Sequence, residues 1–142
     1  MSKELVVIET MVNAPVEIVW EKWNAPAHIT EWYTATPGWH TPQASADFTE
    51  GGSFNYRMEA KDGSFGFDFN GTFDEIVENE FIAYTLADGR EVKITFSSLG
   101  PNTHIEQEFE AEGENPVEMQ KAGWQAILDN FKSYIEGSDE EE

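Results

Sequence analysis

The chain has 142 residues, a length typical of one domain, and its 39% hydrophobic content supports one sizeable core. Its 28 acidic and 8 basic residues give a formal charge of -20, which disfavours nucleic acid and anionic membrane surfaces as partners, since both attract basic proteins. The sequence has no cysteine, which excludes disulfides and thiolate sites, and no signal-like or membrane-spanning apolar run, so we expect a cytoplasmic protein without membrane insertion.

The first part of the chain predicts one strand followed by two short helices. An apolar, β-branched run at residues 5–12 is typical of a strand. Pro15 and Pro26 each suit the start of a helix, and the second of these helices is expected to extend through Trp32. Residues 34–47 contain prolines and a glycine without clear periodicity, which predicts an irregular loop or a poorly formed strand.

The middle of the chain predicts an antiparallel meander. Apolar and polar residues alternate along successive segments, which indicates strands that bury one face and expose the other. The pairs Asp62-Gly63 and Asp88-Gly89 are typical of the tight turns between such strands. The expected strands cover residues 53–60, 65–74, 81–87, 91–99 and 103–112.

The last expected element is an amphipathic helix over residues 115–135, whose apolar residues recur three or four positions apart. Asn115 is placed as its N-cap, Pro116 at the first helical position and Glu118 to complete a capping box. Gly137 is expected to end the helix. The apolar face of this helix needs a cover, which the apolar faces of the strands can supply.

These elements predict an α+β domain of about six strands, with two short helices near the start and one long helix at the end. We expect the domain to cover residues 1–137, and the acidic segment 138–142 to form a flexible tail. No internal repeat and no linker divides the sequence.

Three residues on the expected inner faces suggest a pocket. Gly123 lies in the middle of the last helix, where glycine lowers helix stability by about 1 kcal/mol relative to alanine. Either a close approach of helix and sheet or room for a ligand would offset this loss. Gln107 and Gln120 lie on or near otherwise apolar faces, where they need backbone, water or ligand partners if they are buried. Against a pocket, the ten Phe, five Trp and four Tyr residues could fill the interior themselves.

Short motifs are spread from the end of the first expected strand to the last helix. They are Ala14–Trp20, Pro26–Trp32, Phe48, Gly51-Gly52-Ser53-Phe54 with Asp62-Gly63, Gly71–Ile76, Thr103 and Gly123-Trp124. In this order they resemble the START-like or SRPBCC superfamily, and within it a bacterial single-domain member of the family of the activator of heat-shock protein 90 ATPase (AHSA-type). At Trp32-Tyr33-Thr34 the chain departs from the Trp-Trp-Gly that many relatives carry.

The resemblance implies a helix-grip fold (START/Bet v-like), in which a curved antiparallel β-sheet of about six to seven strands wraps around the long C-terminal helix, with two short helices after the first strand. It also implies a cavity between sheet and helix that binds a small hydrophobic or aromatic ligand. By position, the residues expected to line this cavity are Trp32, Trp39, Phe54, Tyr56, Phe67, Phe69, Tyr84, Phe96, Trp124, Leu128 and Phe131.

The sequence lacks the motifs of phosphate and dinucleotide binding, nucleophilic catalysis and metal binding, so we expect neither a cofactor nor a metal site. Our preferred hypothesis is a ligand-binding module rather than an enzyme. One alternative is a cyclase- or hydrolase-type enzyme that uses His40, Tyr56 or Gln107. Another is a co-chaperone-like protein-interaction module, which the lack of a second domain like that of the full-length activator disfavours. We expect a monomer or a homodimer.

Overall fold

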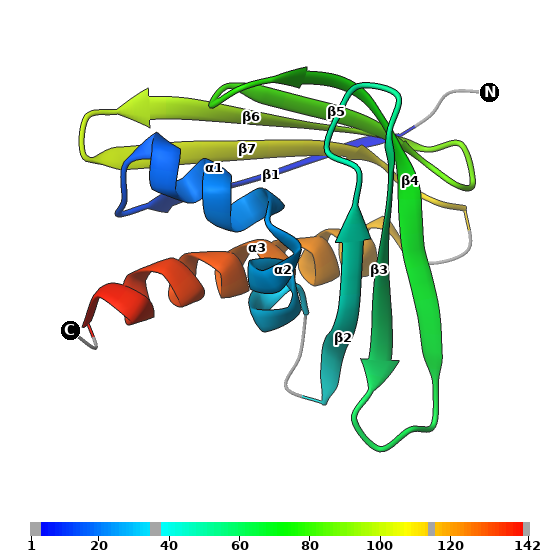
Figure 1. Ribbon diagram of the computed structural model, residues 1–142. Coiled ribbons are helices and arrows are strands. Elements are labelled where there is room, and N and C mark those ends of the chain that lie inside the picture. The colour runs from blue at the N-terminus through cyan, green and yellow to red at the C-terminus, as the bar shows by residue number, and fades with distance from the viewer. Residues whose placement is uncertain (1–3, 35–37, 114–115, 141–142) are drawn as a thin grey trace.

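The computed structural model describes residues 4–34, 38–113 and 116–140. Within them the chain forms a seven-stranded antiparallel sheet and three helices (Figure 1). In chain order the elements are β1 Leu5–Val12, α1 Val16–Asn24, α2 Pro26–Trp32, β2 Trp39–Ala46, β3 Ser53–Ala60, β4 Gly66–Val77, β5 Phe81–Leu86, β6 Glu91–Leu99, β7 Asn102–Glu110 and α3 Val117–Glu140. The strands lie in the order β1-β7-β6-β5-β4-β3-β2, so β1 and β2 are the two edges of the sheet.

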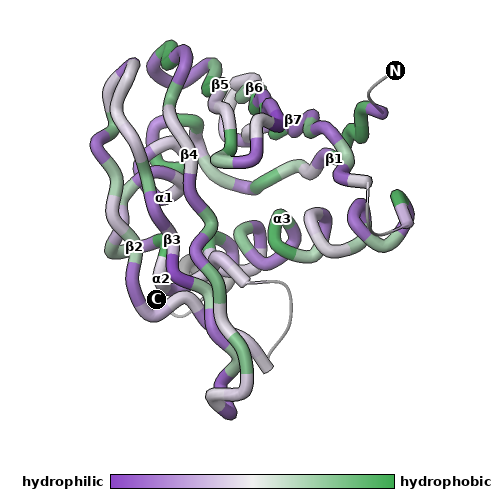
Figure 2. Tube along the Cα trace, turned by 90° about the vertical axis from the view of Figure 1, so that its right-hand side faces the viewer, coloured by the Kyte–Doolittle hydropathy of each residue, from purple (hydrophilic) through white to green (hydrophobic). Residues whose placement is uncertain are grey.

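The sheet curls around α3, which confirms the predicted α+β helix-grip fold. Figure 2 shows β1 and β7 above α3, and β3 and β4 running down beside it. Helix α3 packs on β1, whereas α1 contacts β6 and β7, and α2 contacts β2 and α3. The concave face of the sheet is therefore the face that can enclose a site.

The strands bury side chains in the predicted alternation, with one exception in β4. In β3, Phe54 and Tyr56 are buried on the inner face, as a period of two requires. By contrast, Phe65 is 64% exposed and Phe67 is 42% exposed. These two rings lie at the start of β4 and just before it, where the β3–β4 hairpin extends beyond β5, because β4 pairs with β5 only from Gly71 onward (Figure 1).

Strand β2 forms in the segment for which the sequence leaves a loop and a poorly formed strand as alternatives. Its pairing with β3 is irregular between His40 and Gln43, a stretch that contains Pro42. Proline has no N–H to donate to a ladder, so it is tolerated in edge strands and at bulges. The poorly formed strand is therefore the correct alternative, because β2 lies at the edge of the sheet.

Both ends of α3 differ from the expected helix. The helix begins at Val117, and the carbonyl of Pro116 accepts its first N–H bonds, so Pro116 occupies the cap position rather than the first helical position. The predicted cap residue Asn115 lies outside the described residues. The predicted end at Gly137 is wrong, because the helix continues to Glu140. Glycine ends a helix only when it adopts the left-handed conformation, and its cost within a helix is about 1 kcal/mol.

Large rings from α1 and α2 fill one half of the space between α3 and the sheet. The ring of Trp23 lies 5.6 Å from Phe96 of β6 and 4.9 Å from Phe131 of α3, measured between centroids. Trp20 lies 5.2 Å from Phe96, and Trp32 lies 4.6 Å from Phe131. Such edge-to-face contacts close this half of the interior, so any pocket must lie at the other half.

Candidate ligand-binding site

The space between the first half of α3 and strands β2, β3 and β4 is open. It forms a pocket of about 380 Å³, within the range of small-molecule sites. The apolar part of its lining consists of Trp39, Met58, Phe67, Phe69, Gly123, Trp124 and Ile127. The polar part consists of Tyr33, Arg90, Glu112 and Gln120.

Aromatic rings from β2 and β4 form the outer wall of this pocket. The ring of Trp39 lies 5.9 Å from that of Phe65 and 5.9 Å from that of Phe67. Further in, Phe69 meets the indole of Trp124 edge to face at 6.0 Å. The wall therefore runs from the exposed hairpin to the helix, and it offers ring faces and edges to an apolar or aromatic molecule.

The space beside Gly123 decides between the two explanations for a glycine at this position. A Cβ atom added at Gly123 would have no neighbouring atom within 4 Å. A close approach of helix and sheet is thus excluded as the reason for the glycine. Room in the pocket is the explanation that remains, since Gly123 lines it.

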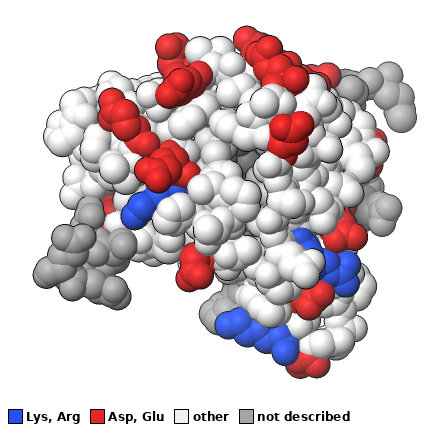
Figure 3. All heavy atoms as spheres, viewed as in Figure 1, with Lys and Arg blue, Asp and Glu red and all other residues white. Residues whose placement is uncertain are grey.

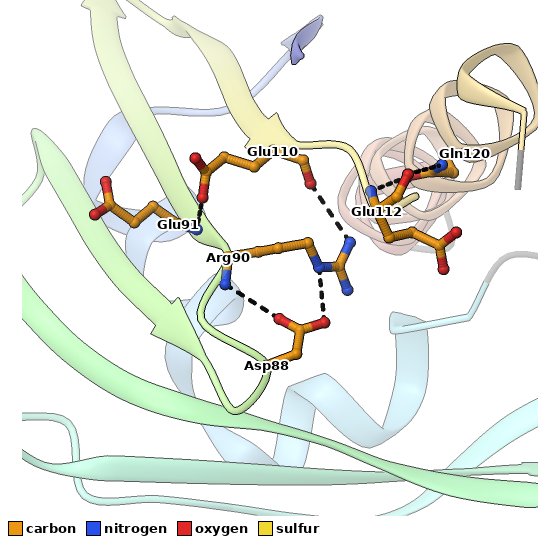
Figure 4. Close-up of polar contacts among 6 residues, drawn as sticks. All are labelled: Asp88, Arg90, Glu91, Glu110, Glu112 and Gln120. Carbon is orange, nitrogen blue, oxygen red and sulfur yellow. Dashed lines mark hydrogen bonds and ion pairs between the residues drawn. The ribbon is translucent and has the colours of Figure 1, made fainter. Parts of the chain in front are cut away.

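The two glutamines on the inner faces have different environments. Gln120 is satisfied by the backbone of Glu112, because its Oε1 accepts from the Glu112 N–H at 2.9 Å and its Nε2 donates to the Glu112 carbonyl at 3.1 Å. This pair joins the chain after β7 to the start of α3 (Figure 4). Gln107 is only 4% exposed and lies on β7 between Ile8 and Ile94, outside the pocket lining.

Arg90 is positioned by the tight turn between β5 and β6. Its main-chain N–H and its Nε both donate to the Asp88 carboxylate, at 3.1 and 2.8 Å. Its Nη1 donates to the carbonyl oxygen of Glu110 at 3.4 Å. Figure 4 shows the side chain extending from this hairpin toward α3. These contacts place the guanidinium of Arg90, whose side chain is 24% exposed, among the polar residues that line the pocket.

Three buried tyrosines lie together next to the pocket, namely Tyr33, Tyr56 and Tyr84. The rings of Tyr33 and Tyr56 are 5.1 Å apart. Burial raises the pKa of each phenol well above its ordinary value, and the charge of Arg90 opposes a small part of this rise at Tyr84. At neutral pH all three are therefore neutral hydroxyl groups, of which Tyr33 reaches the pocket.

Four of the eleven predicted lining residues, Trp39, Phe67, Phe69 and Trp124, line the pocket. The other seven are buried in the core and are absent from the lining. They are Trp32, Phe54, Tyr56, Tyr84, Phe96, Leu128 and Phe131. Several of them lie in the half of the interior that α1 and α2 fill, a packing arrangement that strand and helix periodicity do not specify.

The polar residues considered for catalysis do not converge on the pocket. His40 follows Trp39 on β2, so strand alternation places the two side chains on opposite faces. Tyr56 is buried next to the pocket and Gln107 is buried elsewhere in the interior, and none of these three residues lines the pocket.

The sequence contains signals for some of the lining residues that were not predicted. Met58 shares the inner face of its strand with Tyr56, and Ile127 follows Trp124 by three positions on the same helix face. Tyr33 lies where the chain departs from the Trp-Trp-Gly of related sequences. Arg90 had no such signal, because a residue next to a tight turn is ordinarily solvent-facing.

Surface charge is unevenly distributed. Figure 3 shows acidic side chains across the upper part of the visible face, and basic side chains interspersed with acidic ones near the end of the β3–β4 hairpin. This hairpin carries Arg57 and Lys61. Arg57 pairs with Glu59 at 2.9 Å and lies 3.6 Å from Asp68, so its charge is compensated outside the pocket.

Two other kinds of feature are not found among the described residues. No group of three or more His, Cys, Asp or Glu side chains in this part of the chain is arranged to hold a metal ion. None of the described helices combines the length and the apolar character needed to cross a membrane.

Of the described depressions, the pocket beside Gly123 has the most apolar lining.

The curled sheet around the long helix is the fold of the SRPBCC superfamily, whose members often bind hydrophobic ligands. A family model described as "Activator of Hsp90 ATPase homolog 1-like protein" matches residues 13–136. The chain belongs to this family, because the match covers most of its length. No curated protein matches the sequence.

Solved structures of relatives agree with this assignment. The AHSA1-like protein from Aeromonas hydrophila is 40% identical, and the alignment covers 96% of this chain and 94% of that one with a TM-score of 0.90. Chr148 from Cytophaga hutchinsonii is 47% identical over 96% of this chain and 95% of its own, with a TM-score of 0.82. The Aha1 dimer from Colwellia psychrerythraea shares the fold, with a TM-score of 0.74 at 11% identity over 93% and 96% of the two chains.

Proposed function

We propose that the chain binds a small hydrophobic or aromatic molecule in the pocket between α3 and strands β2 to β4. The observation that carries this proposal is the open space beside Gly123. A glycine in mid-helix weakens the helix, and here no steric contact requires it. The volume that a side chain would occupy is thus left to the pocket.

The chemistry of the walls supports an apolar ligand. Water beside Trp39, Phe69 and Trp124 finds few hydrogen-bond partners, so its displacement by an apolar group is favourable. The mouth is next to the exposed rings of the β3–β4 hairpin, which gives such a molecule an apolar route of entry.

The proposal is tested by titrating the protein with lipids, flavonoids and polyketides in a calorimeter, together with a thermal-shift assay. A ligand at a hundred times its Kd should stabilise the native state by about 2.7 kcal/mol. The decisive variant is Gly123→Leu, whose side chain should project into the pocket and narrow it without a clash at Cβ. We expect this variant to fold and to lose binding.

Lys121→Leu is the matched control, because it adds the same side chain at an exposed position of α3 outside the lining. It should bind as the wild type does. If Gly123→Leu retained wild-type affinity, the ligand would be bound elsewhere. If none of the three ligand classes bound to the wild type, the proposed function would be wrong.

A further inference from the structure

We infer that the ligand of this pocket is an acid, an aromatic or hydrophobic molecule whose carboxylate pairs with Arg90. The inference rests on the proposed binding function and adds the chemical class of the ligand. Arg90 is the one basic residue among those that line the pocket in the described part of the chain.

Hydrogen bonds hold the guanidinium of Arg90 in place, and some of its N–H groups remain able to donate to a ligand. Asp88 binds its main-chain N–H and its Nε, and the Glu110 carbonyl accepts from Nη1. Among the described residues, no hydrogen bond or ion pair engages Nη2. A carboxylate can approach the edge formed by Nη1 and Nη2 in the two-point geometry that arginine favours. Because the turn already orients the side chain, little conformational entropy is lost on binding.

Gln120 and Tyr33, two other polar residues of the lining, carry no positive charge that could pair with an acid. Gln120 is bonded through both ends of its amide to the backbone of Glu112. Tyr33 supplies a neutral hydroxyl beside the other buried tyrosines. Arg90, whose Nε already pairs with the Asp88 carboxylate, is therefore the lining group whose remaining N–H donors can meet a negative charge on a ligand.

The nearby acidic residues decide where such a charge can lie. Asp88 has a side chain that is 55% exposed, so water weakens its repulsion of a ligand inside the pocket. The attraction between Arg90 and the ligand acts beside aromatic walls, where the effective dielectric constant is lower and charge pairs are stronger. Glu112 also lines the pocket, and its carboxylate repels the carboxylate of a ligand. The ligand carboxylate is therefore expected on the side of the pocket where Arg90 lies.

The test compares naphthoate with naphthamide, two ligands with the same rings and nearly the same size but different charge. In calorimetric titrations at physiological ionic strength, the wild type should bind naphthoate about tenfold more tightly than naphthamide. In Arg90→Met, the Kd of naphthoate should rise about tenfold, while that of naphthamide should change by less than about twofold. Arg90→Lys should retain part of the preference, because it keeps the charge without the planar fork.

Arg57→Met is the matched control, since Arg57 is also ion-paired but lies outside the pocket. It should keep the wild-type preference, and circular dichroism confirms that each variant is folded. If the amide binds as tightly as the acid, and Gly123→Leu abolishes both, the ligand-binding function holds and the inference of an acid is wrong. A preference that survives in Arg90→Met also overturns it. If neither naphthalene ligand nor any compound of the wider panel binds, the proposed function fails as well.

Discussion

The indole of Trp124 stacks on the ring of Phe109, with centroids 4.1 Å apart and planes inclined by 9°. Phe109 is fully buried on β7, and α3 contributes the indole from its first half. This stack ties the helix to the sheet at the edge of the pocket. Trp124 therefore has two roles at once, as part of the packing and as part of the lining.

Trp124→Ala should lower both stability and ligand affinity. We expect a loss of about 2 kcal/mol in the free energy of unfolding, less than for a fully buried tryptophan because this side chain is half-buried. Denaturant unfolding and calorimetric titration measure the two effects. Trp124→Phe retains a ring on Phe109 and should keep most of the stability; an unchanged stability in the alanine variant would contradict the structural role of the stack.

Gly123→Ala should stabilise the protein by about 1 kcal/mol, because alanine favours the helix and its Cβ meets no atom within 4 Å. Thermal and denaturant unfolding measure this gain. Gly71→Ala is the opposite case on β4, since its Cβ would lie 2.5 Å from the carbonyl oxygen of Thr85. We expect that variant to be destabilised, and equal effects of the two substitutions would show that the space beside Gly123 is not open.

Stability should fall steeply as the pH rises above about 10. Burial raises the pKa of Tyr33, Tyr56 and Tyr84 in the folded protein, whereas in the unfolded chain they titrate near pH 10. Above that pH the unfolded state has lost protons that the folded state keeps, so unfolding becomes more favourable. Each such tyrosine contributes up to about 1.4 kcal/mol per pH unit to this decline.

Replacing Tyr56 by phenylalanine should make the alkaline decline shallower by about a third, because one of three such groups is removed. Denaturant unfolding at a series of alkaline pH values gives the slope, and near-ultraviolet absorbance of tyrosinate reports the ionisation. Tyr134→Phe is the control, since Tyr134 is less buried and its pKa is raised less strongly. Equal slopes in the wild type and in Tyr56→Phe would show that Tyr56 does not contribute to the alkaline loss of stability.

Thr103→Val should cost about 1 to 3 kcal/mol of stability. The hydroxyl of Thr103 is fully buried and donates to the carbonyl of Ala14 at 2.8 Å, which joins the segment between β1 and α1 to β7. Valine has nearly the same shape but leaves that carbonyl without this partner. Thr103→Ser restores the donor, so it should recover part of the loss in denaturant unfolding, and a valine variant as stable as the wild type would show that the bond contributes little.

The sequence by itself determined the order and type of nearly all elements. The period of two in β3, β6 and β7, and the spacing of three and four in α3, are local properties that specify which face of each element is buried. The prolines at positions 15 and 26 located the starts of α1 and α2 to within a residue. The end of α3 escaped prediction, because Gly137 is compatible with a helix as well as with its termination.

Only the tertiary structure decided which inner-face rings line the pocket and which fill the core. Phe69 and Phe96 both lie on strands of the curled sheet, but α1 places Trp20 and Trp23 against Phe96 and leaves Phe69 at the open space. Arg90 reaches the same space because a tight turn brings it to the start of α3 (Figure 4). Periodicity specifies the face of an element and not the neighbour that it meets, which depends on how distant segments pack.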